Sequence, residues 1–306
     1  MSNKIILGSR GSKLSIAYAN KVLSLLLDIK PALEKEVILK TIKTSGDLFD
    51  KKKISEIGGK NLFCKEIEDK LISKEIDIAV HSLKDLDSVE TDGLVIQAYL
   101  KRNDPRDTLV SSKFKKLSEL NGQKIGSSSR RRELQLKQLN RNIKVESIRG
   151  NIDTRIKKIE NGEYDGAILA LAGLKVLNLE KYAKEIFSLK DFLPTAGQGI
   201  VAVQCRAQDD HIKKILKEIN HKETETCALA ERSFLKTLGG DCDTAVGCTA
   251  ILNKKDIELK AQLFSDDGTK VFNITKTGKE NEPELLGKLA GEEILKQSGK
   301  NFIKKR

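Results

Sequence analysis

The sequence contains no tryptophan, and Phe, Tyr and Trp together make up only 4% of its 306 residues. Aromatic side chains supply the platforms on which single-stranded nucleic acids stack, so this scarcity disfavours a single-strand binder. The chain also lacks any apolar run close to the roughly 20 residues that a transmembrane helix needs. A membrane-spanning class is therefore excluded.

Cysteine and histidine are few and scattered. Five cysteines and three histidines occur, with no Cys-x-x-Cys motif and no paired Cys/His spacing that would bind zinc. An odd number of widely spread cysteines is typical of reduced thiols. The N-terminal residues lead straight into a strand-like run without a secretory hydrophobic region. We therefore expect a cytoplasmic protein without a metal site.

Basic residues exceed acidic ones, 56 against 44, which gives a formal net charge of +12 and favours anionic partners. Many lysines follow patterns of solvated helices, and a lysine excess of this kind is more typical of a soluble surface or of genome composition than of a binding site. Arginine differs, because its guanidinium group binds carboxylates and phosphates in a bidentate manner. The arginines cluster in the middle of the chain, at Arg130, Arg131, Arg132, Arg141, Arg149 and Arg155. This cluster, with no aromatic residue in it, predicts small polyanionic ligands rather than nucleic acid.

Two parts of the chain follow one pattern. A strand, a Gly-Ser turn and a helix at 4–27 recur at 123–140, and the segment 75–86 resembles 163–174. Because both similarities occur in the same order, they predict two similar α/β lobes. The last third has a helix, alternating strands and a final helix, which indicates a separate α+β domain.

The expected boundaries are 1–99 with 198–217 for the first lobe, 100–197 for the second and 218–306 for the C-terminal domain. Chain crossings near 100–105 and 195–200 would form a double hinge between the lobes. The polar segment 45–60 is predicted to be a mobile loop beside the cleft.

Three junctions between a strand and a helix carry arginine. Backbone N–H groups and the positive helix end favour an anion at such a junction. Helix capping with solvated charge would explain any one of them, but three at corresponding strand ends favour a common cleft. They comprise Arg10 with Ser12, Ser127 to Ser129 with Arg131 and Arg132, and Arg149 with Arg155.

Lys84 and Asp85 follow a buried strand predicted at 76–80. An aspartate at a strand end could protonate a leaving amine or stabilise a developing cation. The alternative is a surface Lys–Asp pair that contributes at most about 1 kcal/mol. His81, next to them, is interpreted as a packed histidine.

Cys242 follows two glycines and an aspartate after a predicted helix. Glycines leave space beside the sulfur for a large group. A helix C-terminus disfavours a thiolate, so a permanent thioether suits Cys242 better than turnover chemistry. The alternative is a small buried cysteine.

Taken together, these segments resemble the porphobilinogen deaminase (hydroxymethylbilane synthase) family. The matching blocks run in order over nearly the whole chain, which makes the set specific although no single block is decisive. They include Gly8-Ser9-Arg10, Gly58-Gly59-Lys60, His81-Ser82-Leu83-Lys84-Asp85, Asp104-Pro105-Arg106-Asp107, Ser127-Ser128-Ser129-Arg130-Arg131-Arg132, Arg149-Gly150-Asn151, Gly197-Gln198-Gly199 and Gly239-Gly240-Asp241-Cys242.

The resemblance implies a fold of two periplasmic-binding-protein-like (type II) lobes and a transferase of tetrapyrrole and haem biosynthesis. It implies that Cys242 holds a dipyrromethane cofactor by a thioether and that Asp85 is the catalytic carboxylate. Lys60 is implied to lie on the mobile loop. The remaining cofactor-binding residues implied are Lys84, Ser127, Ser129, Arg131, Arg132 and Arg155, and the substrate-binding residues are Arg10, Ser12, Phe63, Arg149, Arg155 and Gln198.

The family's reaction adds four porphobilinogen molecules, with loss of ammonia, to the dipyrromethane primer, and water then releases linear hydroxymethylbilane. The implied enzyme is a monomer whose partner is this small molecule, without nucleic acid, membrane or metal. The chain departs from the family pattern at Asp87, Val176 and Thr244-Ala245. We expect these departures to change local rigidity or affinity, not the reaction.

Two other interpretations stay open at this point. A two-lobed anion-binding or regulatory module would take up its ligand reversibly, without a covalent adduct. A basic nucleic-acid binder would show steep, salt-dependent affinity for DNA. Neither explains a cysteine beside two glycines or an aspartate at a strand end.

Overall fold

The computed structural model describes residues 4–44, 64–239, 244–299 and 302. The chain divides into two compact units, Met1–Asn103 with Ile200–Thr226 and Asp104–Gly199 with Cys227–Arg306. The C-terminal sheet belongs to the same unit as the second lobe. The division into three domains at the expected boundaries stays a prediction.

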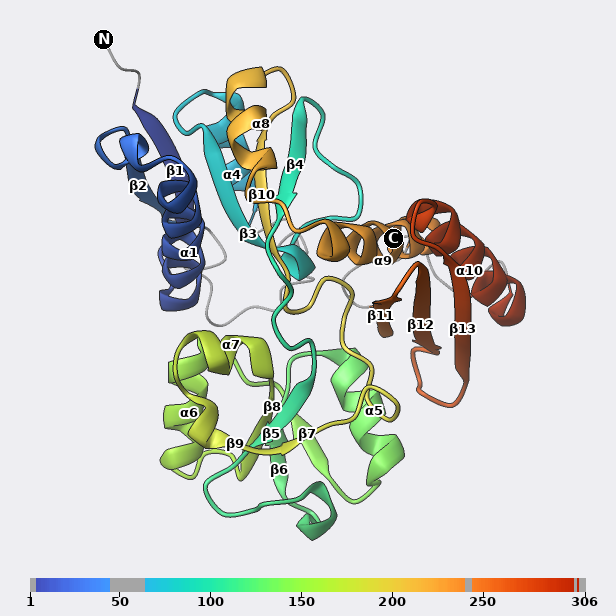
Figure 1. Ribbon diagram of the computed structural model, residues 1–306. Coiled ribbons are helices and arrows are strands. Elements are labelled where there is room, and N and C mark those ends of the chain that lie inside the picture. The colour runs from blue at the N-terminus through green and yellow to red at the C-terminus, as the bar shows by residue number, and fades with distance from the viewer. Residues whose placement is uncertain (1–3, 45–63, 240–243, 300–301, 303–306) are drawn as a thin grey trace. The chain divides into compact units, whose positions relative to one another are not determined.

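The first unit contains a five-stranded sheet with the order β2-β1-β3-β10-β4 (Figure 1). β1 is parallel to β2 and β3, whereas β10 is antiparallel to β3 and β4. The elements are β1 (Ile5–Arg10), α1 (Lys13–Ile29), β2 (Val37–Ile42), α4 (Lys65–Ile72), β3 (Ile78–Ser82), η3 (Leu83–Asp85), β4 (Leu94–Tyr99), β10 (Val201–Arg206) and α8 (Asp210–Lys217), with a short 3-10 helix η1 (Pro31–Lys35) after α1.

Helix α1 begins at the predicted residue because Ser12 caps it. The Ser12 hydroxyl accepts a hydrogen bond from the Ser15 N–H at 3.2 Å, which satisfies one of the free donors of the first turn. The buried side chains Tyr18, Val22 and Leu26 recur at helical spacing. They hold α1 against β1 and β3.

The second unit contains another five-stranded sheet, with the order β7-β6-β8-β5-β9. β6 is parallel to β7 and β8, and β5 is antiparallel to β8 and β9. The elements are β5 (Asp107–Val110), η4 (Leu117–Glu119), β6 (Lys124–Gly126), α5 (Arg130–Leu139), β7 (Lys144–Glu146), α6 (Ile152–Glu160), β8 (Gly166–Ala170), α7 (Leu171–Val176), η5 (Glu180–Tyr182) and β9 (Ala183–Ile186).

The two sheets share one topology. In each sheet, the first three strands in the order are parallel to one another. The fourth strand is antiparallel to both of its neighbours, the third strand and the last. The segments that resemble each other in sequence form β3 and β8, which occupy the same place in the two sheets. The predicted pair of similar α/β lobes, with an α+β segment after them, is therefore confirmed.

The C-terminal part of the second unit packs a three-stranded antiparallel sheet, β11-β12-β13, with two helices (Figure 1). Its core includes Phe234, Leu259 and Ile294, each fully buried. The elements are α9 (Lys222–Leu238), whose first residues belong to the first unit, β11 (Val246–Asn253), β12 (Asp256–Phe264), β13 (Val271–Lys279) and α10 (Pro283–Ser298).

Over the described ranges, none of the helices combines the length and apolar character that a membrane crossing requires. The same residues contain no group of three or more His, Cys, Asp and Glu side chains placed to hold a metal ion.

Candidate functional site

In the first unit, polar side chains gather at one edge of the sheet. β1 and β3 are parallel neighbours, so their carboxyl ends lie at the same edge. β1 ends at Arg10, and β3 ends at Ser82, directly before the 3-10 turn that carries Lys84 and Asp85. The predicted position of Asp85 at a strand end is therefore found.

The apolar neighbours of Lys84 and Asp85 fix how this turn lies. Leu83 and Leu86 are buried, at 2% and 6% exposure, and the Leu83 N–H donates to the Ile200 carbonyl at 3.0 Å. Lys84 and Asp85 are only half-buried. The sequence therefore anchors the turn through its leucines and leaves the two charged side chains accessible.

The charge of Asp85 affects the pKa values of two buried groups, Cys64 and Tyr18. The Cys64 thiol donates a weak hydrogen bond to the Asp85 backbone carbonyl at 3.4 Å. Burial, with the Asp85 charge as a second cause, raises the pKa of Cys64, and the same causes raise the pKa of Tyr18 to about 12. Asp85 thus lies beside a region of low polarity, where its charge stabilises a nearby cation better than it would in water.

His81 is a packed histidine, as expected. It lies within β3 at 5% exposure, and burial lowers its pKa to about 4 despite a hydrogen bond with Gln204. It is therefore neutral near pH 7.

In the second unit, the loops after β6 and β7 meet at one sheet edge. The Ser129 N–H donates to the Ser127 hydroxyl at 3.2 Å, and the Ser129 hydroxyl caps α5 by accepting from the Arg132 N–H at 3.4 Å. The Ser128 hydroxyl donates to the Ile148 carbonyl at 2.7 Å, which joins the two loops. The alternative interpretation, helix capping, therefore applies to the hydroxyl of Ser129, whereas the hydroxyl of Ser127 binds the backbone within the loop.

Arg149 and Arg155 border the loop after β7. The Arg155 Nε donates to the Gly150 carbonyl at 2.7 Å, and both arginines are half-buried. Both residues therefore follow the carboxyl end of β7 in sequence, as the sequence pattern predicted, and both are partly exposed.

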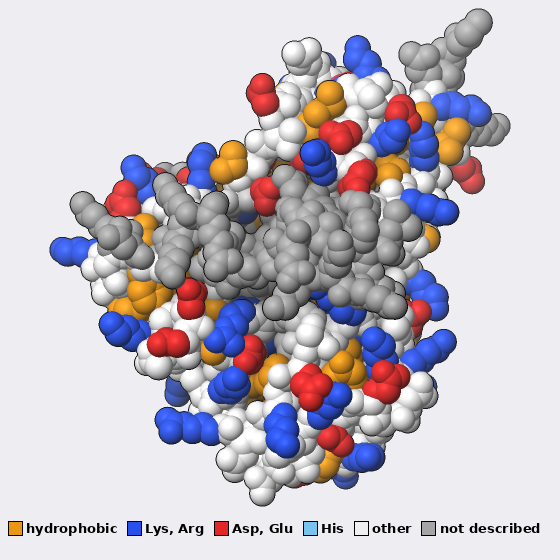
Figure 2. All heavy atoms as spheres, turned by 180° about the vertical axis from the view of Figure 1, so that it is seen from behind, with side chains coloured by type: hydrophobic (Ala, Val, Ile, Leu, Met, Phe, Trp, Pro, Cys, Tyr) orange, Lys and Arg blue, Asp and Glu red, His pale blue; other side chains and the backbone are white. Residues whose placement is uncertain are grey.

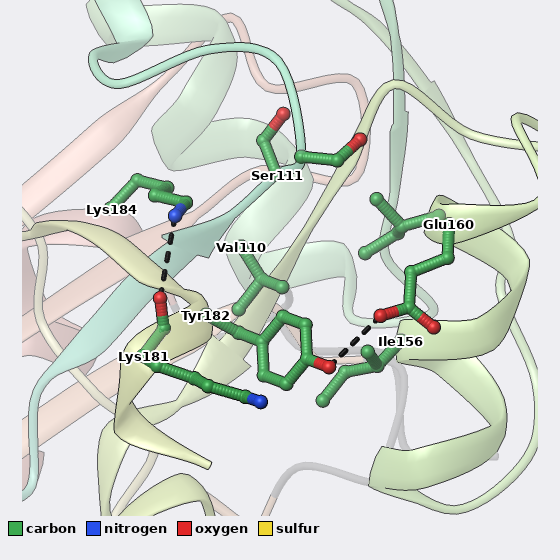
Figure 3. A pocket seen from close by; sticks show the side chains of 9 residues that line it. Val110, Ser111, Ile156, Glu160, Lys181, Tyr182 and Lys184 are labelled. Carbon is green, nitrogen blue, oxygen red and sulfur yellow. Dashed lines mark hydrogen bonds between the residues drawn. The ribbon is translucent and has the colours of Figure 1, made fainter.

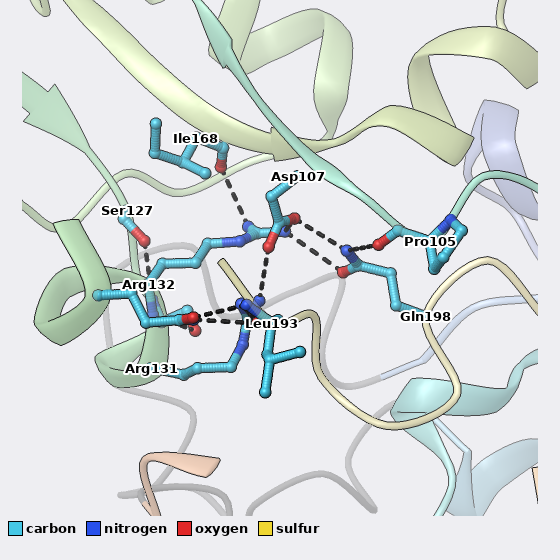
Figure 4. Close-up of polar contacts among 10 residues, drawn as sticks. Pro105, Asp107, Ser127, Arg131, Arg132, Ile168, Leu193 and Gln198 are labelled. Carbon is cyan, nitrogen blue, oxygen red and sulfur yellow. Dashed lines mark hydrogen bonds and ion pairs between the residues drawn. The ribbon is translucent and has the colours of Figure 1, made fainter. Parts of the chain in front are cut away.

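Arg131 and Arg132 are buried together around one carboxylate (Figure 4). Asp107, at the start of β5, accepts from Arg131 Nη2 at 2.9 Å and from Arg132 Nη2 at 2.7 Å. The Gln198 amide donates to the same carboxylate at 2.9 Å. We call these four residues, Asp107, Arg131, Arg132 and Gln198, the arginine–aspartate cluster.

Three further donors of the cluster bind backbone carbonyls. Arg131 Nη1 donates to the Leu193 carbonyl at 2.6 Å, and Arg132 Nη1 donates to the Ile168 carbonyl at 3.0 Å. Gln198, 1% exposed, also donates to the Pro105 carbonyl at 2.7 Å. Its predicted contact with substrate stays a prediction, since its amide is engaged inside the cluster.

The cluster carries an excess of positive charge. Two guanidinium groups face one carboxylate, and they hold the pKa of Asp107 down to about 2 although burial opposes this. The Nε atoms of Arg131 and Arg132 are buried and find no acceptor among the described residues. The net positive charge of the cluster would favour an acidic ligand nearby.

Asp107 belongs to one of the blocks that resemble the family, but it was not among the predicted site residues. A signal was present, because a charged residue opens an otherwise uncharged, fully buried strand, Asp107–Val110. Such a residue requires an ionic partner.

We expect Asp107→Asn to lower the free energy of unfolding at pH 7 by about 3–5 kcal/mol, because it leaves two buried guanidinium groups without their carboxylate. The folded-state pKa of Asp107, about 2, is depressed. Its contribution is therefore present above the unfolded-state pKa and is lost as pH falls through about 2. Urea unfolding, measured from pH 7 downward, should show that the difference in free energy of unfolding between Asp107→Asn and wild type becomes smaller as pH falls. Asp191→Asn, at an exposed site, should change the free energy of unfolding little at any pH.

A cavity of about 300 Å³ lies elsewhere in the second unit, between α6 and η5 (Figure 3). Its polar groups bind one another: the Tyr182 hydroxyl bonds to Glu160 at 2.9 Å, and Lys184 donates to the Lys181 carbonyl at 3.3 Å. None of the predicted site residues lines it. The cavity is therefore not part of the site that the arginine-bearing loops were predicted to form.

One face of the molecule agrees with the interpretation of the lysines as solvated surface residues. On the face in Figure 2, Lys and Arg side chains are interspersed with Asp and Glu rather than gathered alone. Cys242, Phe63, Lys60 and the predicted loop 45–60 lie outside the described residues.

The fold and these residues define a class: α/β proteins of two similar lobes, with arginines at or after the carboxyl ends of strands in each lobe and an aspartate that follows a strand of the first. Sequence comparison is more specific. A family model described as "Porphobilinogen deaminase, dipyromethane cofactor binding domain" matches residues 5–214, and "Porphobilinogen deaminase, C-terminal domain" matches residues 225–296. The chain belongs to the porphobilinogen deaminase family.

Curated relatives named porphobilinogen deaminase cover nearly the whole chain. The protein of Nitrobacter hamburgensis is 38% identical over 97% of this chain and 94% of its own length. That of Ehrlichia canis is 41% identical over 94% of this chain and 99% of its own length. Among solved structures, the methionine binding protein MetQ is similar with a TM-score of 0.47 and 14% identity, covering 72% of this chain and 91% of that one.

Proposed function

We propose that this chain is a porphobilinogen deaminase (hydroxymethylbilane synthase) that builds its product on a dipyrromethane cofactor attached to Cys242. Family membership supports the reaction. The structural observation that supports it most is the arginine–aspartate cluster, in which two guanidinium groups face a single carboxylate, so that its net positive charge suits a polycarboxylate. Every pyrrole unit of cofactor, substrate and product carries two carboxylates, so cationic binding groups are required.

The described residues fit the cofactor. When bound, dipyrromethane supplies a free pyrrole α-carbon as the nucleophile for the first substrate. In the second unit, the buried arginine pair would meet one of its acidic side chains and Arg155 another. The residues that we propose to hold the cofactor are Cys242, Lys84, Ser127, Ser129, Arg131, Arg132 and Arg155.

Asp85 is proposed as the catalytic carboxylate. Its half-buried side chain can accept hydrogen bonds from pyrrole N–H groups and stabilise the positive charge that arises as ammonia leaves the substrate. The low polarity beside it, seen in the raised pKa values of Tyr18 and Cys64, strengthens this electrostatic effect. The residues proposed to bind the substrate are Arg10, Ser12, Phe63, Arg149, Arg155 and Gln198.

We also propose that the enzyme works in the cytoplasm as a monomer, with porphobilinogen as partner and without nucleic acid or membrane. No disulfide joins the four cysteines in the described part of the chain, which supports a reducing compartment. The scarcity of aromatic residues argues against base stacking.

Incubation with porphobilinogen tests the proposal. We expect release of ammonia and of linear hydroxymethylbilane in a ratio of about four to one, because each addition to the primer frees one ammonia. Intact-protein mass should exceed the sequence mass by two linked pyrrole units before substrate is added, and by further units during turnover. Reversible ligand uptake without ammonia or adduct would instead support the anion-binding module, and salt-dependent retention of DNA the nucleic-acid binder.

A further inference from the structure

The segment 193–198 lies against β11, the edge strand of the C-terminal sheet. The Pro194 carbonyl accepts a hydrogen bond from the Cys248 N–H of β11 at 2.8 Å. The approach is close, since a Cβ on Gly247 would lie 2.8 Å from the Leu193 Cβ. The segment therefore runs along β11 much as a paired strand would.

Glu231 of α9 makes the next link between this segment and β11. Its side chain is fully buried, and its two oxygens accept from two backbone donors: Oε2 from the Gly197 N–H at 2.6 Å and Oε1 from the Ala250 N–H at 2.7 Å. Cys248 and Ala250 are alternate residues, so their N–H groups point to the same edge of β11. The carboxylate therefore stands where a neighbouring strand would place a carbonyl.

A carboxylate is needed there because the segment turns away from β11. The Gln198 N–H donates to the Thr195 carbonyl at 3.1 Å, and Gly197 has a φ of 74°, a conformation that favours glycine. This turn directs the Gln198 amide to Asp107 at 2.9 Å. Glu231 thus fixes the turn from one side, and the arginine–aspartate cluster receives Gln198 on the other.

We propose that Glu231 is a positioning residue for cofactor attachment: by holding the Gly197 N–H, it sets Gln198 against Asp107 and so fixes the arginine pair. It also ties α9 to β11, the two elements joined by the connection that carries Cys242. The inference rests on the proposed function, because the arginine pair is assigned there to the acidic cofactor.

Glu231→Gln isolates this role. The glutamine has nearly the same shape but one acceptor oxygen, so one of the two backbone N–H groups faces an NH₂ instead. We expect the covalent loading of apoenzyme with porphobilinogen to slow about tenfold, the rate ratio that matches the loss of one hydrogen bond to a charged group. Glu223→Gln, at an exposed position of the same helix, is the matched control and should load like wild type.

The experiment uses the full chain, produced as apoenzyme in cells that cannot make porphobilinogen, and follows loading by intact-protein mass well below the unfolding temperature of each variant. The pair Glu231→Gln and Gln198→Ala completes a double-mutant cycle. If Glu231 acts through the turn, the double variant has the same loading rate as Gln198→Ala alone. A general loss of stability would instead slow the loading of the double variant further.

Two results would overturn the inference and leave the proposed function standing. One is loading of Glu231→Gln at the wild-type rate, and the other is a double variant whose loading rate falls by the product of the two single reductions. A wild-type apoenzyme that gains no mass from porphobilinogen would overturn the proposed function and this inference with it.

Discussion

Cys242→Ser is expected to yield a folded protein whose mass equals that of its amino-acid sequence and which produces no measurable hydroxymethylbilane. A serine hydroxyl is a far weaker nucleophile than a thiol, so no thioether equivalent forms. Without a covalent primer, the arginines have no tethered chain to hold, and elongation cannot start. Intact mass and product formation, measured on the same sample, check both parts of this expectation.

The other cysteines make the assignment of Cys242 testable by elimination. Cys64, Cys205, Cys227 and Cys248 are 2%, 0%, 7% and 0% exposed, so none offers space for a dipyrrole with acidic side chains. Burial also raises the pKa of Cys205 to about 11, which keeps its thiol protonated.

Cys205→Ser is therefore the matched control. It removes a thiol at a distance in sequence from the predicted attachment site, and the variant should keep the mass increment of two pyrrole units. A Cys242→Ser protein that retained the increment, or a Cys205→Ser protein that lost it while folded, would place the cofactor on another residue.

Local features of the molecule could be predicted from the sequence. The Ser12 cap of α1 and the strand end before Asp85 depend on residues close together in the chain, and hydrophobic periodicity and turn residues specify such features. The two similar sheets could also be predicted, because the repeated segments form β3 and β8 at equivalent places.

The surroundings of the arginines could not be predicted in this way. The binding of acidic side chains by Arg131 and Arg132 stays a prediction, whereas their burial around Asp107, 24 and 25 residues away in sequence, was not expected. Gln198 reaches the same carboxylate across 91 residues. Only the packing of β5, α5 and the segment 193–198 brings these groups together, and no local sequence pattern predicts this contact.

Glu231 illustrates the same limit. It lies in the middle of an amphipathic helix, where a glutamate ordinarily faces solvent. Its burial makes sense only with the two backbone donors, Gly197 and Ala250, that come from other parts of the chain. The sequence predicts candidate anion-binding residues, but not the residues that hold them in place.

Asp85→Asn separates charge from shape at the proposed catalytic position. The asparagine can still accept hydrogen bonds from pyrrole N–H groups, but it carries no negative charge to stabilise the cation formed as ammonia leaves. We expect the mass increment of the cofactor to be largely kept and kcat to fall by about 10²–10⁴-fold, the range associated with loss of a positioned acid–base group.

Two further variants sharpen this expectation. Asp87→Asn removes an equal charge two residues along the chain, at another half-buried position, and should leave kcat close to wild type. Asp85→Glu keeps the charge but moves it outward by one methylene, so it should recover part of the activity that asparagine loses. Because Leu83 and Leu86 anchor the turn, neither change at position 85 should alter the thermal unfolding temperature greatly.

The decisive comparison is between kcat and cofactor content in one preparation. Asp85→Asn enzyme that carries its full adduct and turns over at nearly the wild-type rate would remove Asp85 from the chemistry, and the accessible carboxylate at the end of β3 would then serve only the stability of the turn. Slow turnover that followed adduct loss in proportion would assign it to cofactor attachment instead. Only a large fall in kcat with the adduct in place agrees with a carboxylate that acts on the reacting charge.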